Sequence, residues 1–140
     1  MVNGRIFTKQ KCFLSFSISS DKPSILLAFW DFLWYYENRE KAKKGAHYVI
    51  RIAMCDDETM FLQTYQKKVS ELFQEHNVDC KIDTYTDAVR FLEHCEKTSY
   101  DLIFLDIDMP ELSGIQLASK FRDNGLDTTL VFVSSHDDFV

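Results

Sequence analysis

The chain has 140 residues, of which 46% are hydrophobic and 14% aromatic, and its formal net charge at pH 7 is -6. This length provides one domain with an apolar core, and the acidic balance argues against nucleic acid as a direct partner, because phosphate binding requires a basic surface. The four cysteines contain no CxxC pair and no zinc-ligand spacing, so we interpret them as reduced thiols of a cytoplasmic protein.

Residues 1–48 show no alternation of strand and helix patterns. Their apolar stretch, residues 25–36, contains Asp31, is too short to span a bilayer and lacks the cleavage site of a signal peptide. We expect a helix there, capped by Asp21 or Ser24, and no membrane partner. A helix lying in a membrane interface is the alternative.

The possible codons of this region favour a translation start after residue 1. Residues 43–46, KKGA, can be encoded by a purine-rich sequence typical of a ribosome-binding site, and Val49 can be encoded by the bacterial start codon GTG. We therefore interpret residues 1–48 as translated upstream sequence and residues 49–140 as the domain. A natural extra segment is the alternative.

From residue 49 onward, strand patterns alternate with helix patterns. Short apolar or alternating runs predict four strands, the second of them at a sheet edge: residues 49–54, 79–85, 102–105 and 129–133. Apolar residues at helical spacing predict three helices: residues 59–75, 87 to about 97, and 114–123. Such alternation forms βαβ units with right-handed crossovers. It predicts an α/β fold, a flavodoxin-like doubly wound parallel sheet of strand order 2-1-3-4.

The helix ends carry their own signals. Asn77 is expected to stop the first helix, Thr86 to cap the second, and Ser113 with Gln116 to form a capping box on the third, which Gly125 ends. A fourth helix is expected to begin near Asp137. The inward face of the second helix is expected to comprise Ala88, Val89, Phe91 and Leu92.

Acidic residues follow two of the predicted strands. Asp56 and Asp57 end the first strand and Asp106 ends the third, and in strand order 2-1-3-4 these strands are neighbours. Three carboxylates that converge repel one another unless a cation is present, and Mg²⁺ prefers such hard oxygen ligands. Ser134, after the fourth strand, adds a hydroxyl at the same edge. An acid, a metal and a hydroxyl suit phosphoryl transfer to a carboxylate.

Each of these residues has a plainer interpretation when it is taken alone. Asp56 and Asp57 can be helix caps at the positive end of a helix dipole, Asp106 a loop acid, and Ser134 an ordinary residue at a strand end. Their joint position at the ends of alternate elements favours a functional site.

Together these residues resemble the receiver domain of bacterial two-component response regulators. The resemblance covers residues 49–140 and rests on an acidic pair, the run DIDMP, a glycine and a serine at the matching places: Asp56, Asp57, 106–110, Gly114 and Ser134. The phrases RIAMCDDE, YDLIFLDIDMPELSGI and VFVSSHDDFV are most similar to receivers that precede LytTR-type DNA-binding domains.

The resemblance implies roles for individual residues. Asp106 would accept a phosphoryl group from a sensor histidine kinase and share in binding Mg²⁺. Asp57 would ligate Mg²⁺ directly, Asp56 through water, and Asp108 through its backbone carbonyl. Ser134 would bond the new phosphoryl oxygen and act as the switch. The domain would be a signalling phosphoprotein rather than an enzyme, able to form a homodimer and to regulate transcription through an output domain.

The chain also departs from the family pattern. We can assign no fifth strand with its lysine and aromatic residue, no fifth helix and no output domain, so we interpret residues 49–140 as a C-terminally truncated receiver and expect apolar surface to be exposed on the fourth strand. Nothing in residues 1–48 reads as a replacement parallel strand. Two alternatives remain: a haloacid-dehalogenase-type phosphatase using Asp106 and Asp108 as its DxD motif, or a truncated remnant without function.

Overall fold

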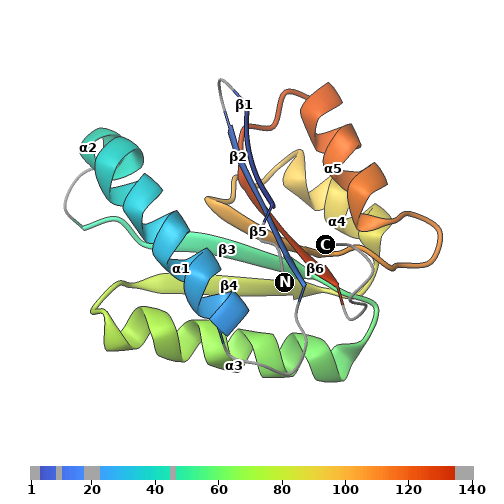
Figure 1. Cartoon of the computed structure of the whole chain (residues 1–140). Coiled ribbons are helices and arrows are strands. Elements are labelled where there is room, and N and C mark those ends of the chain that lie inside the picture. Colours follow the sequence, from blue (N-terminus) through green and yellow to red (C-terminus); the bar gives the residue numbers. More distant parts are fainter. Residues whose placement is uncertain (1–3, 9–10, 18–22, 45–46, 135–140) are drawn as a thin grey trace.

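The computed structural model describes residues 4–8, 11–17, 23–44 and 47–134, and it contains a six-stranded sheet of order β1-β2-β6-β5-β3-β4 (Figure 1). The strands are β1 (Gly4–Thr8), β2 (Lys11–Ser17), β3 (Ile50–Cys55), β4 (Cys80–Tyr85), β5 (Leu102–Asp106) and β6 (Thr129–Ser134). The helices are α1 (Pro23–Tyr35), the π-helix η1 (Tyr36–Glu40), α2 (Lys41–Lys44), α3 (Thr59–Glu75), α4 (Ala88–Cys95) and α5 (Gly114–Asp123). None of the helices in these ranges is long and apolar enough to cross a membrane.

Four of the strands confirm the expected doubly wound sheet. β4, β3, β5 and β6 lie side by side and are all parallel, which is the order 2-1-3-4 counted from residue 49. β4 is at the edge, as its alternating pattern predicts. β5 is buried along its apolar run and ends at a partly exposed Asp106. The parallel arrangement therefore brings the ends of β3 and β5 to the same edge.

The observed bounds of the helices are close to the predicted ones, and one predicted N-cap residue is wrong. α3 and α5 have the predicted bounds, and the Ser113 hydroxyl accepts from the Gln116 amide at 3.2 Å to form the expected capping box. The prediction that Thr86 caps α4 was wrong, because the Asp87 carboxylate accepts from the amides of Val89 and Arg90. α4 thus starts one residue later than expected, and Val89 faces outward, 45% exposed. The region near Asp137 lies outside the described residues.

Two apolar layers cover the two faces of the sheet. One core lies between the sheet and α1 with α3, and includes Phe32, Phe73 and Val131. The other lies between the sheet and α4 with α5, and includes Phe91 and Phe121. Figure 1 shows α3 below the strands and α4 with α5 above them.

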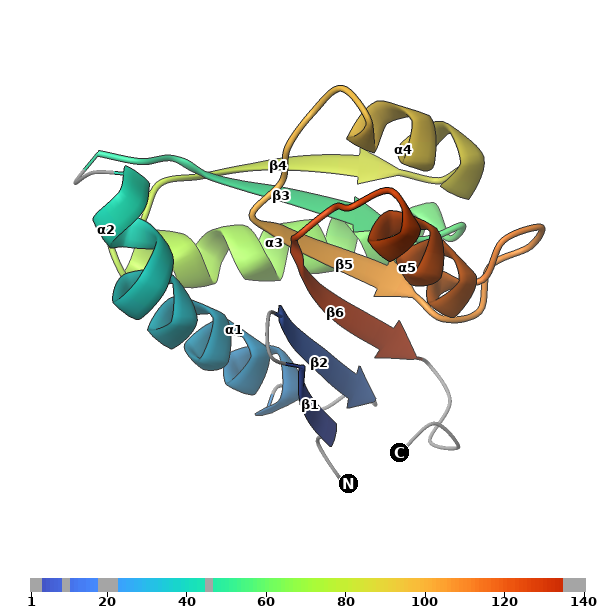
Figure 2. The same cartoon turned by 90° about the horizontal axis from the view of Figure 1, so that it is seen from above.

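The expectation that residues 1–48 supply no parallel strand was wrong. β2 pairs in parallel with β6 over five residue pairs, from Phe13↔Leu130 to Ser17↔Ser134, and β1 pairs antiparallel with β2. Figure 2 shows β2 and β1 continuing the sheet beyond β6, with α1 on the side of α3. The expected open edge of β6 is therefore covered, by a pairing between distant parts of the chain that local patterns do not reveal.

The expected helix in the N-terminal region is confirmed as α1. It begins at Pro23, a residue whose fixed φ suits the first helical position, so Ser24 lies inside the helix and Asp21 lies outside the described residues. Its buried side chains continue into η1 at helical spacing: Phe29, Phe32, Leu33 and Tyr36. This spacing directs one apolar stripe of the helix onto the sheet and α3.

Candidate functional site

The three predicted acids meet at the carboxyl edge of the sheet. Asp56 and Asp57 directly follow β3, Asp106 ends β5, and these strands are paired with Cys55 opposite Leu105. One carboxylate oxygen from each acid lies within 4.8 Å of the other two. This spacing allows all three side chains to contact one small cation.

Burial and mutual repulsion make this cluster unfavourable without a cation. Asp56 is buried, Asp106 is half-buried and Asp57 is exposed. Burial raises the pKa of Asp56, and burial followed by the negative charge of Asp56 raises the pKa of Asp106 to about 7. A hard divalent cation would favour the charged forms of both groups. The donor set of carboxylate oxygens therefore fits Mg²⁺.

Loop amides hold two of the carboxylates in place. Asp56 Oδ1 accepts from the Glu58 amide at 2.9 Å, and Asp106 Oδ1 accepts from the Asp108 amide at 3.1 Å. The capping interpretation of the acidic pair is not supported, because the residue before α3 is Glu58 and no side chain caps that helix. Asp56 and Asp57 are thus placed in the loop beside Asp106 rather than on the helix end.

Gly114 permits a close approach of α5 to the backbone of Asp106. A Cβ atom at this position would lie 2.2 Å from the Asp106 carbonyl oxygen. The Gly114 amide donates to the Ile107 carbonyl at 3.1 Å, which fixes the loop between β5 and α5. The glycine of the sequence pattern is therefore required by space next to the candidate phosphoacceptor.

The two remaining predicted site residues flank this cluster. Asp108 is exposed, two residues after Asp106 in the same loop. Ser134 is the last residue of β6, next to β5, and its side chain lies outside the described part of the structure. The Ile107 amide donates to the Val133 carbonyl at 3.0 Å, which ties the loop after Asp106 to the end of β6.

Sequence reasoning missed the part that Tyr65 plays beside the site. With Asp56, Asp106 and Val133 it lines a cavity of about 10 Å³, roughly the space of one water molecule. Burial and the charges of Asp56 and Asp106 raise the pKa of Tyr65 to about 12. The sequence presented Tyr65 as one member of the apolar face of α3, and only the fold brings it beneath the acids.

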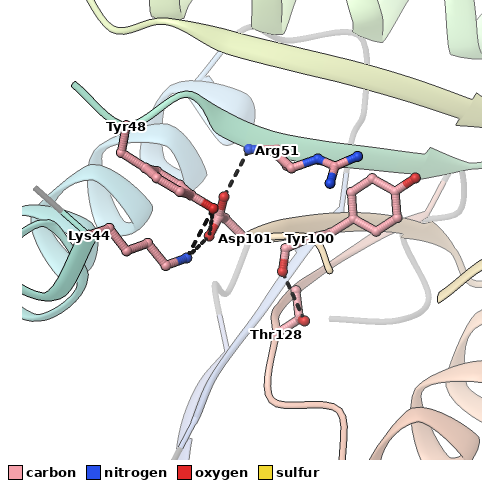
Figure 3. Close-up of polar contacts among 6 residues, drawn as sticks. All are labelled: Lys44, Tyr48, Arg51, Tyr100, Asp101 and Thr128. Atoms are coloured by element: carbon pink, nitrogen blue, oxygen red, sulfur yellow. Dashed lines mark hydrogen bonds and ion pairs between the residues drawn. The ribbon is translucent and has the colours of Figure 1, made fainter. Parts of the chain in front are cut away.

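The sequence analysis also missed a second polar cluster, which lies at the amino ends of the strands, opposite the acids. The Asp101 carboxylate, just before β5, accepts from the Arg51 amide at 2.9 Å and the Tyr48 hydroxyl at 3.3 Å, and forms an ion pair with Lys44 (Figure 3). Nearby, the Thr128 hydroxyl donates to the Tyr100 carbonyl at 3.1 Å. Asp101 is saturated with donors and acts as a structural residue that joins α2 to β3 and β5.

Comparison with known proteins agrees with the geometry. A sequence profile of the response regulator receiver domain matches residues 52–140. The chain is 27% identical over 88 residues to the transcriptional regulatory protein NatR of Bacillus subtilis, covering 63% of this chain and 36% of that protein. It is 30% identical over 91 residues to an uncharacterized response regulatory protein of Staphylococcus epidermidis, covering 65% and 34%. The chain thus matches about a third of the length of these relatives.

Solved structures show the same likeness. The receiver domain of the Francisella response regulator 1452 is 26% identical, with a TM-score of 0.51, and the match covers 63% of this chain and 68% of that one. The response regulator TrrA of Thermotoga maritima, solved in complex with Mg²⁺ and BeF, is 27% identical, with a TM-score of 0.52 and coverage of 65% and 74%. The phosphatase alternative is not retained, because the profile, the acidic cluster and these neighbours all agree: the chain belongs to the response regulator receiver domain family.

Proposed function

We propose that this domain accepts a phosphoryl group on Asp106 from a sensor histidine kinase in the cytoplasm. The observation that carries the proposal is the cluster of Asp56, Asp57 and Asp106, in which one carboxylate oxygen of each residue lies within 4.8 Å of the other two. A carboxylate that is half-buried beside two other acids has little structural use, whereas it suits a phosphoacceptor beside a cation site.

Some of these residues would bind Mg²⁺, and others would contact the phosphoryl group. Asp57 would hold Mg²⁺ directly, Asp56 through a water molecule, and the Asp106 carboxylate and the Asp108 backbone carbonyl would complete the protein ligands. The bound ion would supply positive charge for the oxygens of the phosphoryl group. A carboxylate oxygen of Asp106 would attack the phosphorus while the histidine nitrogen of the kinase departs with its bonding electrons. Ser134 would then bond a phosphoryl oxygen.

Family membership supports a set of proposed partners. We infer that the domain works as a signalling element rather than as a turnover enzyme, that it can pair with a second copy, and that it contacts neither nucleic acid nor membrane itself. Its signal to transcription would pass through an output domain outside residues 1–140. The phrase YDLIFLDIDMPELSGI supports an output domain of the LytTR type.

The test is phosphoryl transfer to the purified full chain from acetyl phosphate with Mg²⁺, followed by intact-mass spectrometry. We expect the mass to increase by one phosphoryl group and the increase to disappear when EDTA removes the metal. Peptide mapping after borohydride trapping is expected to place the modification on Asp106.

Two matched variants make this test specific. D106N removes the proposed acceptor, and E111Q changes an exposed acid in the same loop that has no proposed role. We expect D106N to lose the modification and E111Q to keep it. Absence of the modification in the folded native chain, or its persistence in D106N, would refute the proposal and favour a remnant without this function.

A further inference from the structure

The N-terminal arm, defined here as the described residues 4–8, 11–17 and 23–44, lies outside the match to the receiver family and yet adds strands to its sheet. Its β2 occupies the position beside β6 that would otherwise be the edge of the parallel sheet. Figure 2 shows β2 beside β6 and α1 on the α3 side of the sheet. The receiver elements therefore have a structural neighbour that the family match does not include.

The helix of the arm buries its aromatic anchors in the same core as β6. Phe29 and Phe32 belong to the same buried cluster as Val131 and Val133 of β6. The ring of Phe29 meets that of Phe73 on α3 edge to face, with 5.0 Å between the ring centroids. The arm therefore pairs with the edge of β6 and shares the buried core on one face of that strand.

The far end of the arm is fixed as well. Lys44, the last residue of α2, forms an ion pair with Asp101, whose side chain is only 6% exposed (Figure 3). Although burial lowers the pKa of Lys44, its hydrogen bond and ion pair with Asp101 raise that pKa above the ordinary value of 10.5. The arm is thus held at β2, at α1 and at α2.

The strand that the arm covers also forms one wall of the acidic site. Val133 lies opposite Asp106 in the β5–β6 pairing, and its carbonyl accepts from the Ile107 amide at 3.0 Å. Val133 also lines the small cavity together with Asp56 and Asp106. β6 therefore contacts the arm on one side and the acidic site on the other.

We propose that the arm is an integral part of this domain and that its docking on β6 is thermodynamically coupled to occupancy of the acidic site. When the arm is docked, β2 pairs with β6 and restrains it, and β6 in turn positions the loop after Asp106 through its hydrogen bond with Ile107. Such coupling is reciprocal, so a ligand in the site also tightens the arm. This inference rests on the proposed function, because it requires Mg²⁺ and a phosphoryl group to occupy that site.

The first test uses the native full chain and hydrogen exchange. Amides of residues 11–17 and 29–36 are followed with and without Mg²⁺ and beryllofluoride, while NMR signals of Asp57 and Asp106 report on the site. We expect exchange in both segments of the arm to slow by about fivefold or more when the site is filled. Site signals that shift while exchange in the arm stays unchanged would overturn the coupling alone. Site signals that do not respond would overturn the proposed function and the coupling with it.

The second test uses two variants that lie two residues apart in α1, on opposite sides of the helix. Phe32 is 2% exposed in the core shared with β6, whereas Trp34 is 63% exposed. We expect F32L to weaken Mg²⁺-dependent beryllofluoride binding by about fivefold or more and W34L to leave it unchanged. Equal affinities in the two variants would contradict the inference, and if F32L does not fold, hydrogen exchange in the native chain decides.

Discussion

The two aspartates that flank β5 have opposite surroundings. Asp101, before the strand, is met by donors: a backbone amide, a tyrosine hydroxyl and a lysine ammonium group. Asp106, at the end of the strand, is met mainly by other acids, and burial with the charge of Asp56 raises its pKa to about 7. The same residue type is therefore satisfied by donors at the amino end of β5 and surrounded by like charges at its carboxyl end.

The difference shows that residue type and strand position do not by themselves identify a functional acid. A carboxylate whose oxygens are satisfied by the protein contributes to stability. A carboxylate among like charges reduces stability and remains available to a cation or an electrophile. This contrast leads to four predictions about stability.

The largest effect is expected from removing the satisfied acid. D101A leaves the Arg51 amide and Lys44 without their partner, and we expect the free energy of unfolding to fall by about 3 kcal/mol. Urea denaturation measures this change. D106N serves as the control, since removing a repelled charge is expected to raise stability in metal-free buffer. A loss in D106N as large as that in D101A would contradict the comparison.

Mg²⁺ is expected to stabilise the folded domain only through the cluster of Asp56, Asp57 and Asp106. At a concentration one hundred times its Kd, Mg²⁺ should raise the free energy of unfolding by about 2.7 kcal/mol. We expect this increase in the native chain and in D101A, and none in D57N at the same concentration. Thermal unfolding with and without EDTA measures it, and an undiminished increase in D57N would place the metal elsewhere.

Adding a methyl group beside Asp106 is expected to change the free energy of unfolding less than the two changes above. G114A puts a Cβ against the Asp106 carbonyl, and such overpacking typically destabilises by about 2 kcal/mol. We expect the amide signals of Asp106 and Ile107 to move as the backbone shifts. In the control G125A, the new Cβ has open space and the strain comes from a φ of 73° at that position alone. Unmoved Asp106 signals in G114A would disprove the close approach.

The smallest effect is expected at Lys44. K44M keeps the packing of the side-chain stem but removes the ion pair, and we expect a loss below about 1 kcal/mol at neutral pH, because Lys44 is partly solvated. The pKa of Lys44 is raised in the folded state, so the contribution is present below 10.5 and is lost as the pH rises through the folded value. In urea denaturation, the free energies of unfolding of the variant and the native chain should therefore become equal in alkaline buffer. A difference that does not change with pH would count against the ion pair.

The receiver half of the fold was predictable because its signals are local. Unbroken apolar runs identify β5 and β6, helical spacing gives the bounds of α3 and α5, and the acids follow their strands directly. The position of the Asp87 cap was missed by one residue, because Thr86 and Asp87 are both good capping types and only the backbone distinguishes them.

The N-terminal arm was not predictable in the same way. The pairing of β2 with β6 joins strands whose sequences carry no information about each other, and β2 has only seven residues with a weak alternation. The role of Asp101 was hidden for a similar reason, since its partner Lys44 belongs to the arm. Long-range pairings are decided by tertiary packing, which a local pattern does not contain.

The parallel pairing of β2 with β6 also has a consequence for the order of folding. Residues 11–17 are synthesised long before residues 129–134, and the ladder between them closes a loop that includes most of the chain. Closing so large a loop costs entropy that later contacts must offset, and folds rich in such distant pairings form slowly. On the ribosome, β2 is therefore synthesised well before its partner β6, and we expect this ladder to be among the last parts of the sheet to form.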